Sequence, residues 1–217
     1  MLVRRDAAYY ELERVPGISD EEWLFVLRLQ ANEDAAYDEL VRTYNTPIFH
    51  VAYRMLGDSA EAADIVQDIF LKVFKNINGF KGEAALKTWI YKIAFSEILN
   101  RMRWWRRRHR YSTLSLDEPH TNGDGPSNGD GFHLRDAGPT PEEALHTKEQ
   151  EAGIQLALSK LSGDHRSIVV LRDIEGFAYG EIADVLGVSI GTVKSRLARA
   201  RADLKQSLMR YLSVQRV

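Results

Sequence analysis

The chain of 217 residues contains no cysteine, which excludes disulfide bonds, thiolate metal sites and catalysis by a thiol. It also has no apolar run approaching the roughly 18 residues that a membrane-spanning helix needs. Charged side chains interrupt the first fifteen residues, so the apolar segment of a signal peptide is missing as well. We therefore predict a soluble protein without membrane insertion, located in the cytoplasm.

Patterns typical of catalysis are also lacking. The six histidines are scattered, and no Ser/His/Asp set, metal-ligand spacing or pair of carboxylates stands out. The sequence therefore predicts a protein that is not an enzyme and that binds no metal or other cofactor. An alternative is a nucleic-acid-modifying enzyme that grips its substrate through basic side chains, and a nuclease assay separates the two.

Charge is distributed unevenly, although the formal net charge is only −2. Residues 111–143 hold seven acidic side chains and one arginine, a net charge of −6, which leaves +4 for the rest of the chain. Four of the six prolines and many Asn, Gly, Asp and Ser residues lie in the same stretch. Such a composition cannot offset the entropy lost on ordering, so it predicts a flexible acidic linker. A surface loop of a single domain is the alternative, but it would be unusually long.

Helical periodicity dominates on both sides of this linker. Between residues 64 and 77, apolar side chains recur at helical spacing and form one continuous stripe. Residues 35–56 carry a similar stripe, which Pro47 is expected to kink or divide. A further helix is expected from Trp89, with core spacing that continues to Ile98.

No strand pattern of comparable length occurs, so the predicted fold is all-α. The linker at residues 111–143 is expected to separate two small helical domains, which occupy residues 20–110 and residues 144–217. Residues 1–19 are expected to form an N-terminal extension, for which the sequence suggests no role.

Residues 100–110 combine six arginines and two tryptophans without any acidic side chain. Arginine neutralises phosphates, and tryptophan stacks on unpaired bases or packs beneath a guanidinium group. A solvated helix end, where cations complement the negative end of the helix dipole, is the simpler alternative. One or two arginines would suit that alternative, but the mutual repulsion of six favours a polyanion. This run therefore predicts contact with nucleic acid.

Residues 179–197 fit a helix-turn-helix motif. Ala183 is small enough for two helices to cross closely, Gly187 suits the tight turn, and Ser189 can cap the second helix. Over residues 190–205, lysine and arginine outnumber acidic residues five to one. The outer face of the second helix is predicted to present Thr192, Lys194, Ser195, Arg196 and Arg199. Such a face suits the major groove of DNA, and we favour this interpretation over an ordinary helical hairpin with a polar face.

Three stretches together resemble the extracytoplasmic-function (ECF) sigma factors, the smallest class of the sigma-70 family of promoter-specificity subunits of bacterial RNA polymerase. Residues 58–80 are similar to the segment that binds the polymerase core. Residues 88–108 are similar to the helix that melts and reads the −10 element, and residues 161–204 to the domain that reads the −35 element. Only these two sigma domains are visible, which points to the ECF class.

The resemblance implies roles for particular residues. Those that would dock on the largest polymerase subunit are Asp64, Gln67 and Asp68. Those that would contact or support the −10 element are Phe80, Lys81, Trp89, Ser96, Asn100, Arg101 and Arg103, with Phe80 and Lys81 in a loop that captures a flipped base. Those that would read the −35 element are Thr192, Lys194, Ser195, Arg196 and Arg199. Two departures from the family, Ala178 and Gly180, are expected to loosen the first helix of the helix-turn-helix.

The resemblance further implies three partners, which are the RNA polymerase core, promoter DNA and an anti-sigma factor. The acidic linker would pass through a polymerase channel, where its charge could mimic nucleic acid. From the residues alone, a stand-alone helix-turn-helix transcriptional regulator with a helical sensor domain stays open. That alternative explains residues 161–205 but gives no reason for the arrangement of residues 64–108.

Overall fold

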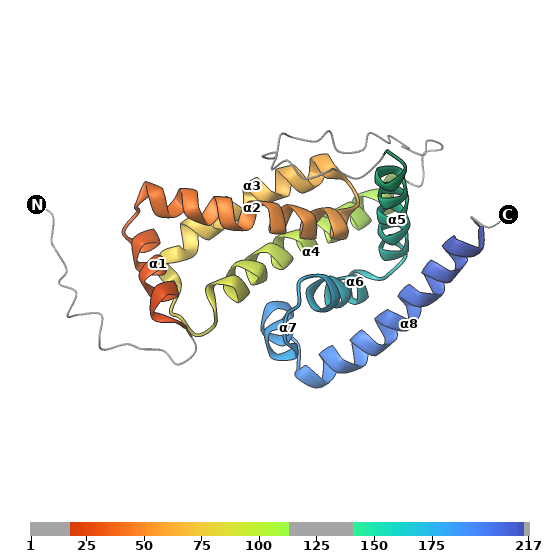
Figure 1. The fold of residues 1–217 in the computed structure, drawn as a ribbon. Helices are drawn as coiled ribbons and strands as arrows, with labels where there is room; N and C mark the ends of the chain where they lie inside the picture. The colour runs from red at the N-terminus through yellow and green to blue at the C-terminus, as the bar shows by residue number, and fades with distance from the viewer. Residues whose placement is uncertain (1–17, 113–140, 215–217) are drawn as a thin grey trace, which may run out of the picture.

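The computed structural model describes residues 18–112 and 141–214, which contain helices and no strand (Figure 1). Within those residues the predicted all-α fold is therefore confirmed. Most of the predicted extension (1–19) and of the predicted linker (111–143) lies outside the described residues. None of the described helices is long and apolar enough to cross a membrane.

The N-terminal half consists of four α-helices, and a short 3₁₀ turn follows the third. These elements are α1 (Asp20–Gln30), α2 (Asp34–Leu56), α3 (Ser59–Asn76), the turn η2 (Ile77–Gly79) and α4 (Leu86–Ser112). Side-chain caps start two of the helices: the Ser19 hydroxyl accepts from the backbone N–H of Glu22, and the Asp58 carboxylate from that of Glu61. The apolar stripes predicted for α2, α3 and α4 all face the interior of this helical group.

Pro47 does not divide α2, which continues from Asp34 to Leu56. The sequence left open whether Pro47 would kink or divide the helix, and division does not occur. The proline removes one intrahelical N–H donor. Ile48 and Val51 in the following turn are fully buried, so tertiary packing holds the helix together where the local sequence would weaken it.

The C-terminal half contains four more α-helices and a turn of π-helix. These elements are α5 (Pro141–Ser159), α6 (Gly163–Val169), the π turn η3 (Val170–Ile174), α7 (Tyr179–Leu186) and α8 (Ile190–Val214). Because α4 runs on to Ser112 and α5 begins at Pro141, both helices extend a few residues into the segment predicted to be linker.

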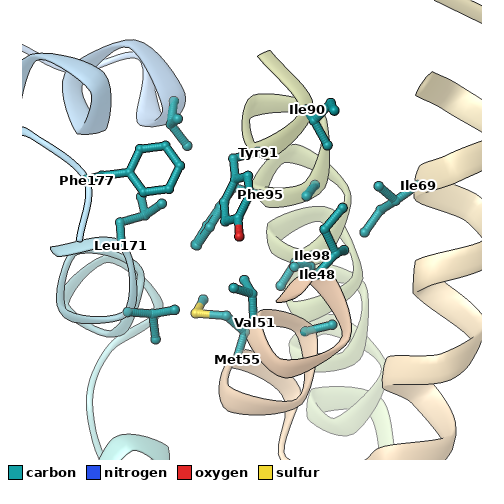
Figure 2. Close-up of a cluster of buried hydrophobic side chains, with 14 of the residues drawn as sticks. Ile48, Val51, Met55, Ile69, Ile90, Tyr91, Phe95, Ile98, Leu171 and Phe177 are labelled. Atoms are coloured by element: carbon teal, nitrogen blue, oxygen red, sulfur yellow. The ribbon is translucent and has the colours of Figure 1, made fainter. Parts of the chain in front are cut away.

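The two helical groups pack against each other and share one hydrophobic cluster. Figure 2 shows Val51 and Met55 of α2 and Tyr91 of α4 facing Leu171 and Phe177 of the C-terminal group. The rings of Tyr91 and Phe177 lie 4.8 Å apart between centroids, and the Tyr91 hydroxyl donates to Glu175 at 2.6 Å. Helical periodicity predicted the helices of both groups but not the interface between them. An apolar stripe shows that one face of a helix is buried, but it does not show which other helix covers that face.

Candidate nucleic-acid interface

The exposed face of α3 carries the three residues predicted to dock on polymerase. Asp64, Gln67 and Asp68 are exposed and lie within two turns of the helix, while Ile65 and Ile69 on the opposite side are buried. The structure thus brings the predicted set together on one accessible surface, which is acidic and suited to a basic partner.

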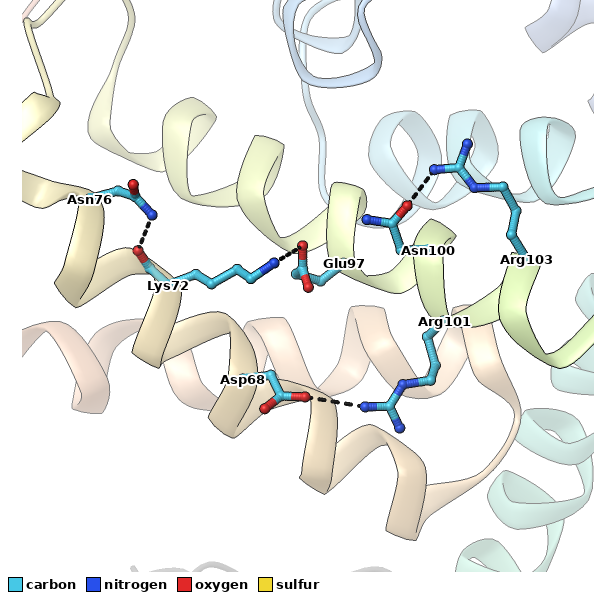
Figure 3. Close-up of polar contacts among 7 residues, drawn as sticks. All are labelled: Asp68, Lys72, Asn76, Glu97, Asn100, Arg101 and Arg103. Atoms are coloured by element: carbon cyan, nitrogen blue, oxygen red, sulfur yellow. Dashed lines mark hydrogen bonds and ion pairs between the residues drawn. The ribbon is translucent and has the colours of Figure 1, made fainter.

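Ion pairs connect this α3 surface to α4 (Figure 3). The Arg101 guanidinium donates to Asp68 at 3.2 Å, and the Lys72 ammonium lies 2.6 Å from Glu97. Arg101 also donates to Glu61 at 2.7 Å. Arg101 was predicted to contact DNA, and Asp68 was predicted to contact polymerase. The ion pair between them therefore links the two predicted sites. The pairing leaves Arg101 only partly exposed.

A polar stripe runs along α4 from its first turn toward its arginine-rich end. Trp89, Ser96, Asn100 and Arg103 follow one another at helical spacing and therefore share a face. Ser96, Asn100 and Arg103 are exposed, and the Arg103 guanidinium donates to the Asn100 side-chain oxygen at 2.6 Å (Figure 3). These groups can offer hydrogen bonds to unpaired bases and phosphates.

The loop between η2 and α4 holds the other two predicted −10 residues. Phe80 is buried, and its ring packs edge-to-face on Trp89 at 5.3 Å, whereas Lys81 is exposed. A cavity of about 460 Å³ opens beside this pair, with Thr88, Lys92 and Asp184 also in its wall. Lys81 can therefore meet a ligand directly, while Phe80 can only support the wall.

A second, larger groove of about 800 Å³ lies between α3 and the arginine-rich end of α4. Arg103, Trp104 and Arg107 line it, together with Asp68 and Glu97. Trp104 is 44% exposed, and the Arg108 guanidinium lies 4.9 Å from its ring centroid. The acidic lining residues are paired with Arg101 and Lys72, whereas no ion pair of Arg103 or Arg107 occurs among the described residues. The groove therefore suits a polyanion.

The predicted helix-turn-helix consists of α7, a tight turn and α8. Gly187 adopts a left-handed backbone with φ of 65°, and Ser189 caps α8 by accepting from the backbone N–H of Thr192. Val193 and Leu197 of α8 and Ile182 of α7 form the buried seam. The predicted turn and cap are both confirmed.

The five residues predicted for the outer face of α8 differ in how accessible they are. Lys194, Ser195 and Arg199 are exposed, as a DNA-reading face requires. The Thr192 hydroxyl is held 2.8 Å from that of Ser189, and Arg196 forms an ion pair with Asp164 of α6 at 3.2 Å. DNA would therefore compete with Asp164 for Arg196.

The start of α7 compensates for its missing serine cap. Alanine at position 178 offers no side-chain acceptor, but the Glu181 carboxylate accepts from the Ala178 backbone N–H at 2.7 Å. One half of a capping box thus remains, and it offsets part of the loosening expected from Ala178 and Gly180.

Several structurally important residues escaped the sequence reasoning. Gln155 and Arg166 of the C-terminal group donate to backbone carbonyls at the end of α2, and Glu22 and Gln30 of α1 hold the loop before α4. Each acts through a backbone group remote in sequence, and no local pattern marks such a contact. No cluster of His, Asp or Glu side chains placed to hold a metal ion occurs within residues 18–112 and 141–214.

The fold and these surfaces define a helical protein that joins a helix-turn-helix to a second unit with an aromatic and basic face. Comparison with protein families agrees: residues 40–111 match the model of sigma-70 region 2, and residues 152–204 match that of sigma-70 region 4.

Two relatives are similar over most of the chain. The RNA polymerase sigma-H factor of Pseudomonas aeruginosa is 30% identical over 89% of this chain and 96% of its own length. The ECF RNA polymerase sigma factor SigW of Bacillus subtilis is 30% identical over 84% of this chain and 94% of its own. The sigma factor RpoE of Bartonella quintana, solved in complex with the anti-sigma factor NepR, superimposes with a TM-score of 0.58 at 25% identity, covering 80% of this chain and 96% of that one.

The chain belongs to the ECF group of the sigma-70 family. Members of this family are promoter-specificity subunits without catalytic chemistry of their own, so the comparisons give no support to an enzyme. A stand-alone helix-turn-helix regulator is not favoured either, because it leaves the region 2 match at residues 40–111 unexplained.

Proposed function

We propose that this chain directs bacterial RNA polymerase to promoters by docking on the core enzyme and reading the −10 and −35 elements. The observation that carries the proposal is the presence, in one chain, of a helix-turn-helix and of a polar aromatic stripe on α4 beside an acidic docking face. The chain supplies recognition, while the polymerase core supplies the chemistry. Such a subunit would work in the bacterial cytoplasm.

For docking, we assign Asp64, Gln67 and Asp68 of α3 to the largest polymerase subunit. Their shared exposed face and their negative charge support this assignment. Because Asp68 is paired with Arg101, docking would draw on a carboxylate that already has a cationic partner.

For the −10 element, the assigned residues lie along α4 and in the loop before it. Ser96, Asn100 and Arg103 would hydrogen-bond to exposed bases or phosphates, and Arg101 would join them on release from its carboxylates. Lys81 would face a base extruded into the cavity beside Trp89. Extrusion costs a few kcal/mol of unstacking, which the cavity must offset.

For the −35 element, α8 would lie in the major groove with Lys194, Ser195 and Arg199 toward the DNA. Arg196 would exchange Asp164 for a base or phosphate, and Thr192 would hold the start of the helix. Either domain alone would bind DNA weakly, so tight binding requires the polymerase to fix their separation.

An anti-sigma factor is the remaining proposed partner. Its support is the similarity to the Bartonella quintana sigma factor, which was solved in complex with one. The acidic linker lies outside the described residues, and its passage through a polymerase channel stays a prediction.

Purified chain mixed with bacterial core polymerase and genomic DNA fragments tests the proposal. We expect the chain to enter a complex with core and to produce transcripts that begin at a defined set of sites, absent with core alone. The variant Asp64→Arg changes one exposed residue of the proposed docking face. It should abolish both the complex with core polymerase and the specific transcripts. The proposal fails if wild-type chain gives neither core capture nor specific starts.

A further inference from the structure

One side-chain amide of α1 bridges both ends of the turn that begins the loop before α4. The Gln30 Nε2 group donates to the carbonyl oxygen of Ile77 at 3.1 Å and to that of Phe80 at 3.3 Å. The Phe80 backbone N–H also donates to Ile77 at 3.0 Å, which closes the turn. Gln30 therefore fixes the backbone immediately before Lys81, through two bonds that only a donor can make.

At the other end of the same loop, α1 provides the cap of α4. The Glu22 Oε1 atom accepts from the backbone N–H of Leu86 at 2.8 Å, and Leu86 is the first residue of α4. This N–H has no partner within the helix, and a carboxylate there also complements the positive end of the helix dipole. Glu22 therefore fixes where the loop ends and where α4 begins.

Between these two anchors, Ile18, which lies two residues before α1, and Trp23 of α1 lie against the loop at Gly82. This glycine has φ of 76°, and a Cβ built on it would lie 3.1 Å from Ile18 and 3.2 Å from Trp23. The positive φ and the close approach of Ile18 and Trp23 both favour glycine at this position. Glu22, Trp23 and Gln30 of α1 thus hold the six-residue loop, residues 80–85, at its two ends and at Gly82.

We propose that Gln30 and Glu22 are positioning residues for the −10 element, which set the shape of the base-capture cavity from behind the loop without touching DNA. The inference rests on the proposed function, because it requires Lys81 and the cavity beside Trp89 to take an extruded base. Both residues act through backbone atoms of the loop, so they would govern which base fits rather than how strongly the duplex is held.

The physical reason is preorganisation. A site that must accept one base and reject three needs its wall held within a fraction of an ångström. Without the bonds to Gln30 and Glu22, the loop would adopt several conformations. Binding of any base would then require the same free energy to order the loop, whichever base is captured. Discrimination at the captured position would fall, while contacts made by α8 with the −35 element and by α3 with polymerase would be unaffected.

Two isosteric substitutions give opposite expectations and form the test. Gln30→Glu replaces the amide donor with an acceptor that faces two carbonyl oxygens, so both bonds are lost. Glu22→Gln keeps an acceptor oxygen for Leu86, whereas Glu22→Ala removes it. Arg28→Ala is the control on α1, because Arg28 pairs with Glu33 and Glu39 and forms no hydrogen bond or ion pair with the loop within residues 18–112.

The measurement uses holoenzyme reconstituted from core and full-length chain on a promoter mapped with the wild-type protein. Every base of the −10 element is varied in turn, and the fraction of heparin-resistant open complexes is measured. We expect Gln30→Glu and Glu22→Ala to reduce base discrimination about tenfold, the value of one to two hydrogen bonds, at the same single position that Lys81→Ala affects. Glu22→Gln and Arg28→Ala should stay within about threefold of wild type.

Unchanged discrimination in Gln30→Glu and Glu22→Ala overturns the inference. Equal loss at every −10 position also overturns it, because that result indicates general loosening of the domain. Should Gln30→Glu fail to bind core polymerase, Gln30→Ala takes its place under the same criteria. Failure of the proposed function is distinguishable, since wild-type holoenzyme would then give no specific start on any template.

Discussion

Replacing Arg166 with methionine tests the contact between the two helical groups. Arg166 is only 7% exposed, and its guanidinium donates to Met55 at the end of α2, to Ser159 at 2.7 Å and to Leu161 at 3.4 Å. Burial lowers the pKa of Arg166, and nearby Arg106 lowers it further. The side chain thus places a cation against the carbonyl end of α2, where the helix dipole is negative.

The cost of this substitution follows from opposing contributions. Each hydrogen bond from a charged donor contributes about 1.5–3 kcal/mol, but loss of the guanidinium also removes the penalty of burying a charge whose Nε atom has no partner in the described structure. Methionine preserves the packing of the apolar stem. We expect the free energy of unfolding to fall by about 3 kcal/mol, or roughly 6–12 °C in Tm for a chain of this size.

Urea denaturation followed by circular dichroism measures this loss. Wild type and Arg166→Met should each unfold in one transition, because Tyr91, Phe177 and Glu175 still join the two helical groups, and the midpoint of Arg166→Met should lie at the lower urea concentration. Arg172→Met is the control, since Arg172 donates one bond to Phe177 within the C-terminal group and should cost about 1 kcal/mol. A change below about 1 kcal/mol in Arg166→Met would refute the reasoning.

Four further predictions concern function and pH. Asp64→Arg should abolish capture of core polymerase in a pull-down while circular dichroism stays helical, and retained capture would show that the docking face is elsewhere. Arg196→Ala should weaken the free energy of binding to the −35 element by about 1–3 kcal/mol. An unchanged footprint over the −35 element would show that Arg196 does not contact it. Trp104→Ala should weaken binding of holoenzyme to single-stranded −10 DNA by about 1–3 kcal/mol, and equal affinity would exclude stacking there. Burial and the bond to Glu175 raise the pKa of Tyr91, and burial raises that of Tyr44 to about 12, so the stability that these neutral phenols provide is present below about pH 10 and lost as the pH rises further. Unfolding in urea should become easier between about pH 10 and 12, less so in Tyr91→Phe, and a flat profile contradicts this.

Sequence patterns predicted those parts of the structure that depend on local spacing. The stripe in residues 64–77 indicated both the core of α3 and the exposed face that carries Asp64 and Asp68. Gly187 and Ser189 indicated the turn and cap of the helix-turn-helix, because a left-handed turn and an N-cap each require a particular residue type. Such features can be predicted since a few neighbouring residues determine them.

Contacts between distant segments could not be predicted in this way. Asp164 and Arg196 are 32 positions apart, and nothing in either local sequence identifies the other as its partner. Phe80 lies in the loop where it was expected, and its ring is buried on Trp89. The sequence could not show this burial, because a loop has no periodicity that reveals which side chains turn inward. Pro47 was expected to kink or divide α2, and buried neighbours keep that helix continuous.

Permanganate footprinting of a mapped promoter tests the central claim most directly, because it reports melting of the −10 element by the joint action of chain and polymerase. Thymines in the −10 element should become reactive only when core polymerase and this chain are both present, with protection of the −35 element in the same complex. Reactivity with core alone, or a complex in which the −10 element stays double-stranded, would contradict the account.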